Sequence, residues 1–204
     1  MLDQQGTTPI ADIKGLRVEF ETKDGTVVGV EDVSFSVNPG ETVCVVGESG
    51  SGKSVSSLSL MRLVEFGGGS IAGGNLVFDR KDADAVDLAA TEQELMRTIR
   101  GNEIGMIFQE PMTALNPVFT VGRQLTEGLR LHKGMSKREA EDRALALLRQ
   151  VRIPEPARRL CQYPPELSGG MRQRVVLAMA LACEPRPRIA HQTTPPLGVT
   201  TQAA

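Results

Sequence analysis

The sequence predicts an α/β fold in which a glycine-rich loop joins a buried parallel strand to a helix. The apolar run at 42–46 is typical of a strand buried in a parallel sheet. The eight residues GESGSGKS at 47–54 follow it directly, and the run at 55–63 after them favours a helix. Alternating apolar and polar residues upstream, between 16 and 37, predict an antiparallel β layer.

The loop at 47–54 fits the phosphate-binding pattern G-x-x-x-x-G-K-[ST]. Its glycines allow backbone N–H groups to converge on an anion, and the helix that follows adds partial positive charge. Lys53 is expected to reach the β- and γ-phosphates of ATP, and the Ser54 hydroxyl to bind Mg²⁺. A glycine-rich turn that binds nothing is the alternative, which the flanking strand and helix disfavour. The predicted phosphate site consists of Gly47, Glu48, Ser49, Gly50, Ser51, Gly52, Lys53 and Ser54.

The antiparallel layer is predicted from two alternating segments and the turn between them. Residues 16–20 and 26–30 flank a turn at 23–25, which is a hairpin signal. The alternation resumes at 33–37 and stops at an Asn-Pro-Gly sequence. These segments place a small antiparallel sheet ahead of the phosphate loop.

Between the loop and the middle of the chain, glycines and a capping pattern mark further elements. Glycines at 67–69 and 73–74 predict a loop that leads to a strand at 76–78. Thr91 begins a capping box for a short helix that ends at Gly101.

Another buried strand and another capped helix are predicted further on. The run at 104–108 indicates another buried strand, which ends at Gln109. A capping box at 136–139 starts a helix with one apolar face at a 3.6-residue period. That face consists of Ala140, Ala144, Leu147, Leu148 and Val151.

A second motif, LSGGMRQR, occupies residues 167–174. Ser168 is a good N-cap, and Gly169 and Gly170 leave backbone N–H groups open to an anion. The apolar run at 175–182 predicts the helix that this cap begins. An ordinary capped helix after a turn explains the segment when it is taken alone. Combined with the phosphate loop, the run L-S-G-G-x-x-Q-R resembles the signature of ABC ATPases.

Composition limits the classes of function. The chain has 204 residues, enough for one domain with a sizeable core. Its net charge is −2 and aromatic residues make up 3%, so neither a basic surface nor stacking platforms for nucleic acid are expected. No disulfide framework or metal spacing is visible among Cys44, Cys161 and Cys183, and Cys44 and Cys183 are expected to be buried thiols. Because no apolar run approaches 18 residues and no signal peptide is visible, membrane association is expected to require a partner.

Gln109 lies where open α/β sheets place ligands, at the carboxyl end of a predicted strand. A strand terminus at the surface is the simpler interpretation without further context. However, FQEPMTALNP at 108–117 resembles the Q-loop of ABC importers in the peptide, opine and nickel branch. VGESGSGKS at 46–54, QVRIPE at 150–155 and YPPEL at 163–167 are similar to that branch as well. The chain most resembles the N-terminal half of the ATPase subunits that import glutathione.

This resemblance implies a P-loop NTPase core of the ABC ATPase type, with an antiparallel β layer and a helical subdomain. It implies one truncated domain over 1–204, in which 12–108 and 176–204 form the nucleotide-binding core and 109–175 the helical subdomain. Gln109 would sense Mg²⁺ and the attacking water. Ser168, Gly169 and Gly170 would contact ATP held by a second ATPase half in a head-to-tail dimer. Phe20 is the candidate for stacking on adenine, although it is expected to point into the antiparallel layer.

The implied function is that of an ATP-binding, energy-coupling subunit of an ABC importer for glutathione or short peptides. Its cofactors would be ATP and Mg²⁺, and its place the cytoplasmic face of the bacterial inner membrane. Permease subunits in that membrane would be its partners, with a periplasmic binding protein acting indirectly and nucleic acid taking no part. The segment after Gln109 would contact the permease.

The end of the chain departs from the family pattern at its chemistry. His191 stands in the place of the Mg²⁺-supporting Asp, Gln192 in that of the catalytic Glu, and Gly198 in that of a loop Asp. An amide cannot take a proton from water as a carboxylate can. A new metal site is an alternative, but one His and one amide are too few ligands. Pro187 and Arg188 are expected to damage a central strand.

Three explanations for this end remain open: a degraded or mis-sequenced gene end, a truncated pseudogene product, or an ATPase half that does not hydrolyse ATP. The chain stops before the family's switch histidine. Two functional classes follow, an importer's energy-coupling subunit and a nucleotide-binding regulatory module without turnover. A soluble ABC ATPase outside transport is a third, which the importer form of the Q-loop disfavours.

Overall fold

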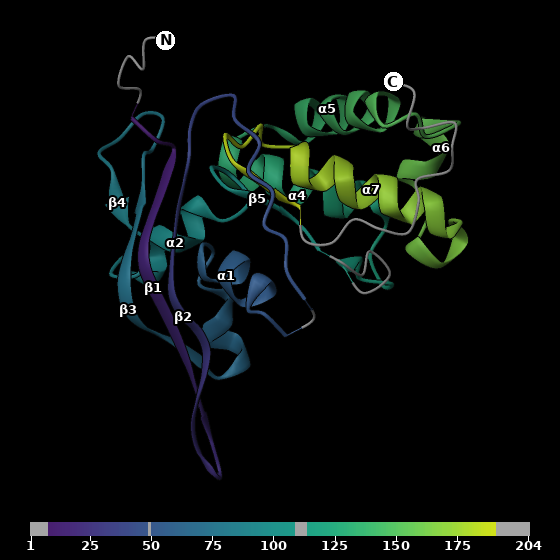
Figure 1. Cartoon of the computed structure of the whole chain (residues 1–204). Coiled ribbons are helices and arrows are strands. Elements are labelled where there is room, and N and C mark those ends of the chain that lie inside the picture. Colours follow the sequence, from purple (N-terminus) through teal and green to yellow (C-terminus); the bar gives the residue numbers. More distant parts are fainter. Residues whose placement is uncertain (1–7, 49, 109–113, 191–204) are drawn as a thin grey trace, which may run out of the picture. The chain divides into compact units, whose positions relative to one another are not determined.

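The computed structural model describes residues 8–48, 50–108 and 114–190, and the chain divides into two compact units, Met1–Arg100 and Gly101–Ala204 (Figure 1). The described elements of the first unit are β1 (Ala11–Thr22), β2 (Gly25–Val37), α1 (Lys53–Ser59), the 3₁₀ helix η1 (Leu63–Gly67), β3 (Gly69–Phe78), β4 (Val86–Asp87) and α2 (Gln93–Ile99). Those of the second unit are β5 (Gly105–Ile107), α4 (Val121–Lys133), α5 (Lys137–Gln150), α6 (Pro156–Leu160), the 3₁₀ helix η2 (Pro164–Glu166), α7 (Gly169–Leu181) and β6 (Arg188–Ala190).

The first unit is built on the predicted antiparallel layer. Its strands follow the order β2-β1-β3-β4, and β1 and β2 form the hairpin with Thr22 paired to Gly25 across the turn. The alternation at 33–37 continues β2. Apolar residues of β1, β3 and α2 are buried, and they follow period-two and helical patterning except at the register shift between Ile13 and Leu16. They include Ile13, Leu16, Val18, Leu76, Phe78, Met96 and Ile99.

The glycines at 73–74 do not form the predicted loop, because they lie inside β3. Gly15 of β1 and Gly74 of β3 both have positive φ, at 60° and 93°. A Cβ on Gly74 would lie 2.5 Å from the carbonyl oxygen of Gly15. The strand pairing shifts register here, so the glycines mark a bulge where two backbones approach closely.

The capping box predicted at Thr91 is wrong by one residue. The helix α2 begins at Gln93 with Glu92 as its N-cap, and no side chain caps it. The Thr91 hydroxyl instead donates a hydrogen bond of 2.6 Å to the carbonyl oxygen of Asp87. The tight turn after β4 therefore uses the hydroxyl that the sequence pattern had assigned to the helix.

The strand predicted at 42–46 does not form. Residues 41–48 have no helical or strand hydrogen bonding, and the side chains of Val43, Val45 and Val46 are 37%, 51% and 82% exposed. Cys44, predicted to be buried, is exposed as well. A parallel strand is held by its ladder partners, and no strand in the described parts of the chain pairs with this run.

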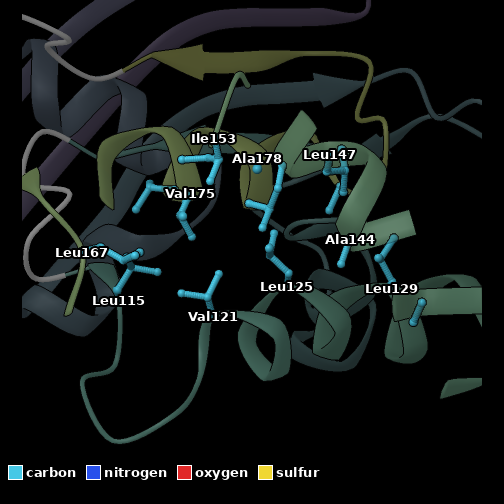
Figure 2. Close-up of a cluster of buried hydrophobic side chains, with 14 residues drawn as sticks. Leu115, Val121, Leu125, Leu129, Ala144, Leu147, Ile153, Leu167, Val175 and Ala178 are labelled. Carbon is cyan, nitrogen blue, oxygen red and sulfur yellow. The ribbon is translucent and has the colours of Figure 1, made fainter. Parts of the chain in front are cut away.

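The second unit has a helical core. Side chains from α4, α5 and α7 and from the segments that adjoin them meet in one buried cluster (Figure 2). The predicted face of α5 lies in it, with Val151 partly buried at its edge. The cluster consists of Leu115, Val121, Leu125, Leu129, Ala140, Ala144, Leu147, Leu148, Ile153, Leu167, Val175, Val176, Ala178 and Ala182.

The predicted capping box of α5 is confirmed. The Ser136 hydroxyl accepts from the Glu139 N–H at 3.4 Å, and the Glu139 carboxylate accepts from the Ser136 N–H at 2.8 Å. These bonds from Ser136 hold the pKa of Glu139 below its ordinary value.

The predicted strand at 104–108 is confirmed as β5, which pairs in parallel with β6. The expectation that Pro187 and Arg188 would damage the strand is wrong in these described residues. The Pro187 carbonyl accepts from the Gly105 N–H at 3.1 Å, and Arg188 is exposed. Pro187 precedes the strand, so its missing N–H removes no hydrogen bond from the ladder. Arg188 is exposed, so its charge is not buried in the sheet.

Cys183 is buried, as predicted, and its thiol lies 3.8 Å from the Gly128 carbonyl oxygen, to which it donates. Burial raises the pKa of this thiol. Among the described helices, none has the length and apolar character needed to cross a bilayer.

Candidate functional site

The phosphate loop has the backbone that its glycines predict. Gly50 and Gly52 both adopt a left-handed conformation with φ of 83°. A Cβ on Gly52 would lie 2.9 Å from the carbonyl oxygen of Gly29 in β2, and one on Gly47 would lie 2.6 Å from the Ser51 hydroxyl oxygen. Glycine is therefore required by conformation or by space at these points. Ser49 lies outside the described residues.

Lys53 closes the loop on itself. Its ammonium donates to the Gly47 carbonyl oxygen at 2.7 Å, to the Glu48 carbonyl oxygen, and to the Ser51 hydroxyl at 3.2 Å. These three acceptors lie on the loop that is predicted to surround phosphate. The ammonium is thus held by acceptors of the loop itself, which an anion can replace.

The helix α1 starts directly from the loop. Gly52 is its N-cap and makes no side-chain cap bond, so the first turn's N–H groups are not capped by that residue. Ser54 lies in this turn and is exposed. Behind it, the buried Ser56 and Ser59 are satisfied by donating to the carbonyl oxygens of Gly52 and Val55. The two buried hydroxyls of α1 are thereby paired, while Ser54 is exposed.

These residues fit a phosphate group, and they fit Mg²⁺ only in part. Left-handed glycines, a helix start and a lysine converge on one small loop, which is the donor set that anions use. For Mg²⁺ the described residues offer one hydroxyl, at Ser54. That single ligand suits an ion that keeps several waters and takes further oxygens from phosphates. Nowhere in the described ranges do three His, Cys, Asp or Glu side chains gather as for a metal.

Phe20 packs within the antiparallel sheet. A Cβ on Gly29 of β2 would lie 2.6 Å from its ring, and one on Gly69 of β3 would lie 2.7 Å from it. The ring therefore covers two glycines on the strands beside it. Phe20 is half-buried there, and stacking of its ring on adenine stays a prediction.

The signature segment begins a helix as predicted. The Ser168 hydroxyl accepts from the Met171 N–H at 3.3 Å and caps α7. Gly169 and Gly170 are exposed, and a Cβ on either would meet no atom within 4 Å. Neither glycine has positive φ. In the described residues, neither backbone conformation nor lack of space requires glycine at these two positions, in contrast to the phosphate loop.

The remaining predicted site residues lie outside the described residues. These are Gln109, His191 and Gln192, together with Gly198. Part of the segment after Gln109 is described, from Ala114 onward. Leu115 is buried there in the helical cluster, and Ala114 is exposed.

Sequence reasoning missed one group of residues, at the start of α4. Gln124 is 9% exposed, and its side-chain amide bonds to the loop at 116–119. Thr120 caps α4 by accepting from the Arg123 N–H at 3.3 Å. The threonine followed by Val121, Leu125 and Leu129 at four-residue spacing is the signal that could have located this helix.

Comparison with known proteins agrees with these features. Residues 30–190 match the model of the ABC transporter family. A putative peptide import ATP-binding protein of Brucella melitensis biotype 1 is 57% identical over 195 residues, which cover 96% of this chain and 58% of that protein. A glutathione import ATP-binding protein of Pectobacterium atrosepticum is 52% identical over 95% of this chain and 31% of its own length.

A solved structure confirms the fold class. The dimeric structure of an ATP-binding cassette in a post-hydrolysis state, bound to ADP and phosphate, is similar with a TM-score of 0.75 and 26% identity. The match covers 88% of this chain and 72% of that one. Because the family model matches most of the chain, including both the phosphate loop and the signature segment, this chain belongs to the ABC transporter family.

Proposed function

We propose that this chain is the ATP-binding, energy-coupling part of an ABC importer for glutathione or short peptides. The observation that carries the proposal is the loop at 47–54, with left-handed Gly50 and Gly52 and the inward-held Lys53 ammonium. The names of the similar import proteins support the cargo class. The chain spans only about half the length of the first of these relatives, so activity, cargo and partners are part of the proposal.

In the proposed site, Gly47, Glu48, Ser49, Gly50, Ser51, Gly52, Lys53 and Ser54 hold the phosphates. Bound Mg²⁺ supplies positive charge that stabilises the phosphoryl group, and the Ser54 hydroxyl is one of its ligands. Lys53 exchanges its three partners within the loop for phosphate oxygens. Gln109 would sense the metal ion and the attacking water.

A second ATPase half completes the proposed site. Ser168, Gly169 and Gly170 would contact ATP held by that half in a head-to-tail dimer. The open space around the two glycines supports this role, because a ligand can approach the backbone of the first turn of α7. The proposed division into a core at 12–108 and 176–204 and a helical subdomain at 109–175 assigns the two motifs to different parts.

A nucleotide titration tests the phosphate site. Lys53→Ala should weaken Mg-ATP binding by about 1.5–3 kcal/mol, the range for hydrogen bonds to charged groups, which is roughly 10- to 150-fold in affinity. Arg188→Ala is a matched control, because it removes an exposed charge from β6. Equal affinities for the wild type and Lys53→Ala would contradict the proposal.

The proposed partner is a permease of the inner membrane, bound through the segment after Gln109 at the cytoplasmic face. The two prolines of that segment restrict its backbone, so it can present a fixed shape. A cysteine at Ala114, which is exposed, should crosslink to permease loops in inside-out membrane vesicles that contain the permease. Crosslinks only at remote positions would show that the docking surface is elsewhere.

The alternative is a nucleotide-binding half that does not hydrolyse ATP, and Gln192 favours it. Its amide cannot act as a base, so we expect negligible phosphate release from this chain. Restoring acidic residues with His191→Asp and Gln192→Glu separates a damaged enzyme from a dedicated binder. Phosphate release by the unchanged chain that Lys53→Ala abolishes would refute the expectation.

A further inference from the structure

The loop that leads into α4 is braced far more than its position at the surface requires. It spans 116–119, and the Val118 side chain is 68% exposed. The Asn116 side-chain oxygen accepts from the Val118 N–H at 3.0 Å. The Arg123 guanidinium lies 3.8 Å from the centre of the Phe119 ring, within cation–π distance.

The main brace is the buried amide of Gln124. Its oxygen accepts from the Asn116 N–H at 2.9 Å, and its nitrogen donates to the carbonyl oxygens of Asn116 and Phe119, also at 2.9 Å. The side chain thus pairs with Asn116 in the way that a neighbouring strand would. Three bonds occupy both donors of the amide and one of its acceptor sites.

Packing does not explain this glutamine. It lies on α4 between Val121 and Leu125, which are buried in the helical cluster. An apolar side chain at that position could join the cluster without the cost of burying an amide. A hydrogen-bonded buried amide adds little net stability, but it selects one arrangement of the groups that it bonds.

Ordering a surface loop costs conformational entropy for each residue held. Here the bonds from Gln124 hold the backbone while Val118 stays exposed. A fixed backbone that carries an exposed apolar residue lowers the entropy lost when a partner binds. The arrangement therefore favours a loop prepared for contact with another protein.

We propose that Gln124 is a positioning residue for permease docking, which holds 116–119 in the shape that presents Val118 and Phe119 to the permease. This inference rests on the docking proposed above. The amide acts through the loop and makes no contact with nucleotide. Changing it should therefore alter docking and leave Mg-ATP affinity unchanged.

The test uses the chain with Cys44 and Cys161 replaced by serine and Ala114→Cys as the crosslinking site, because both natural cysteines are exposed. Gln124→Leu removes all three bonds, and Gln124→Glu keeps the acceptor but removes both donors. Leu129→Ala is the matched control, since it opens a cavity elsewhere on α4 and should lower the melting temperature at least as much. All variants are compared below their melting temperatures in vesicles that contain the permease.

We expect both Gln124 variants to reduce crosslinking about tenfold, as a loss of about 1.4 kcal/mol of docking free energy would do. Hydrogen exchange at the Asn116 amide should accelerate in the Gln124→Leu variant, while Mg-ATP affinity stays at the wild-type value. Leu129→Ala should keep both crosslinking and Asn116 protection. Together these results separate positioning of the loop from general loss of stability.

Unchanged crosslinking in Gln124→Leu, or equal loss in Leu129→Ala, would overturn the positioning role while the docking surface stands. Absence of any permease crosslink when Gln124 is intact would overturn the docking proposal, and the positioning role with it. The two failures are therefore distinguishable in one series of experiments.

Discussion

The phosphate loop and the signature segment are both rich in glycine, but the backbone conformation and the space around their glycines differ. In the loop, Gly52 has positive φ and no room for a Cβ beside the Gly29 carbonyl. In the signature segment, Gly169 and Gly170 have ordinary φ and open space around them. The loop glycines are needed by the chain's own backbone, whereas the described residues place no such demand on the signature glycines.

Gly50 is intermediate between Gly52 and the signature glycines, because it has positive φ but open space around it. Its φ of 83° equals that of Gly52, yet a Cβ on it would meet nothing within 4 Å. Backbone strain alone acts at Gly50, strain and collision act together at Gly52, and neither acts at Gly170. Alanine at the three positions should therefore have three different effects.

The largest effect is expected from Gly52→Ala. A left-handed alanine and a contact of 2.9 Å with the Gly29 oxygen should lower the free energy of unfolding by about 1–3 kcal/mol or shift the loop. Mg-ATP binding should weaken as well, because the loop can no longer hold its shape. Gly50→Ala should cost about 1–2 kcal/mol, from strain alone. Chemical denaturation and nucleotide titration check both, and equal effects of the two would contradict the role of the collision.

A smaller effect of opposite sign is expected from Gly170→Ala. Alanine fits the first turn of α7 without strain, so the variant should be more stable by about 0.4–1 kcal/mol. If the signature contacts ATP on a second ATPase half, the same variant should reduce ATP-dependent dimer formation. Denaturation and sedimentation of the ATP-bound protein measure the two properties. If Gly170→Ala were less stable than the wild type, the conclusion that a Cβ fits at this position without a clash would be wrong.

The smallest effect concerns the caps of α5 and α7. The bonds from Ser136 lower the pKa of Glu139, so the stabilisation from this carboxylate is present above the ordinary glutamate pKa. It is lost as the pH falls through the lowered pKa. The cap of α7 has Met171 at the corresponding position and carries no such dependence.

Glu139→Gln should therefore be less stable than the wild type at neutral pH, and this difference in the free energy of unfolding should shrink in acid. The measurement is the urea midpoint of both proteins between about pH 3 and 7, with the largest difference above the ordinary glutamate pKa of about 4.3. Met171→Leu is the matched control at α7 and should follow the wild-type pH dependence. Parallel curves for the wild type and Glu139→Gln would show that the box contributes no pH-dependent stability.

Local sequence signals succeeded where one short segment contains both partners of an interaction. The capping box of α5, the cap of α7 and the hairpin of β1 and β2 are of this kind. They failed where a residue has several possible partners nearby. Thr91 bonds to Asp87 rather than capping α2, and Gly73 and Gly74 lie in a bulged strand rather than a loop.

By itself, the sequence predicted the capped starts of α5 and α7 and the apolar face of α5, because each depends on residues close together along the chain. Only the tertiary structure decided the fate of the apolar run at 42–46, since a strand needs a ladder partner that its own residues cannot supply. It also decided the hydrogen-bond partners of Gln124, whose amide lies in an otherwise apolar stripe. A buried polar group is understood only when its partners are known, and these lie on a loop that folding brings to it.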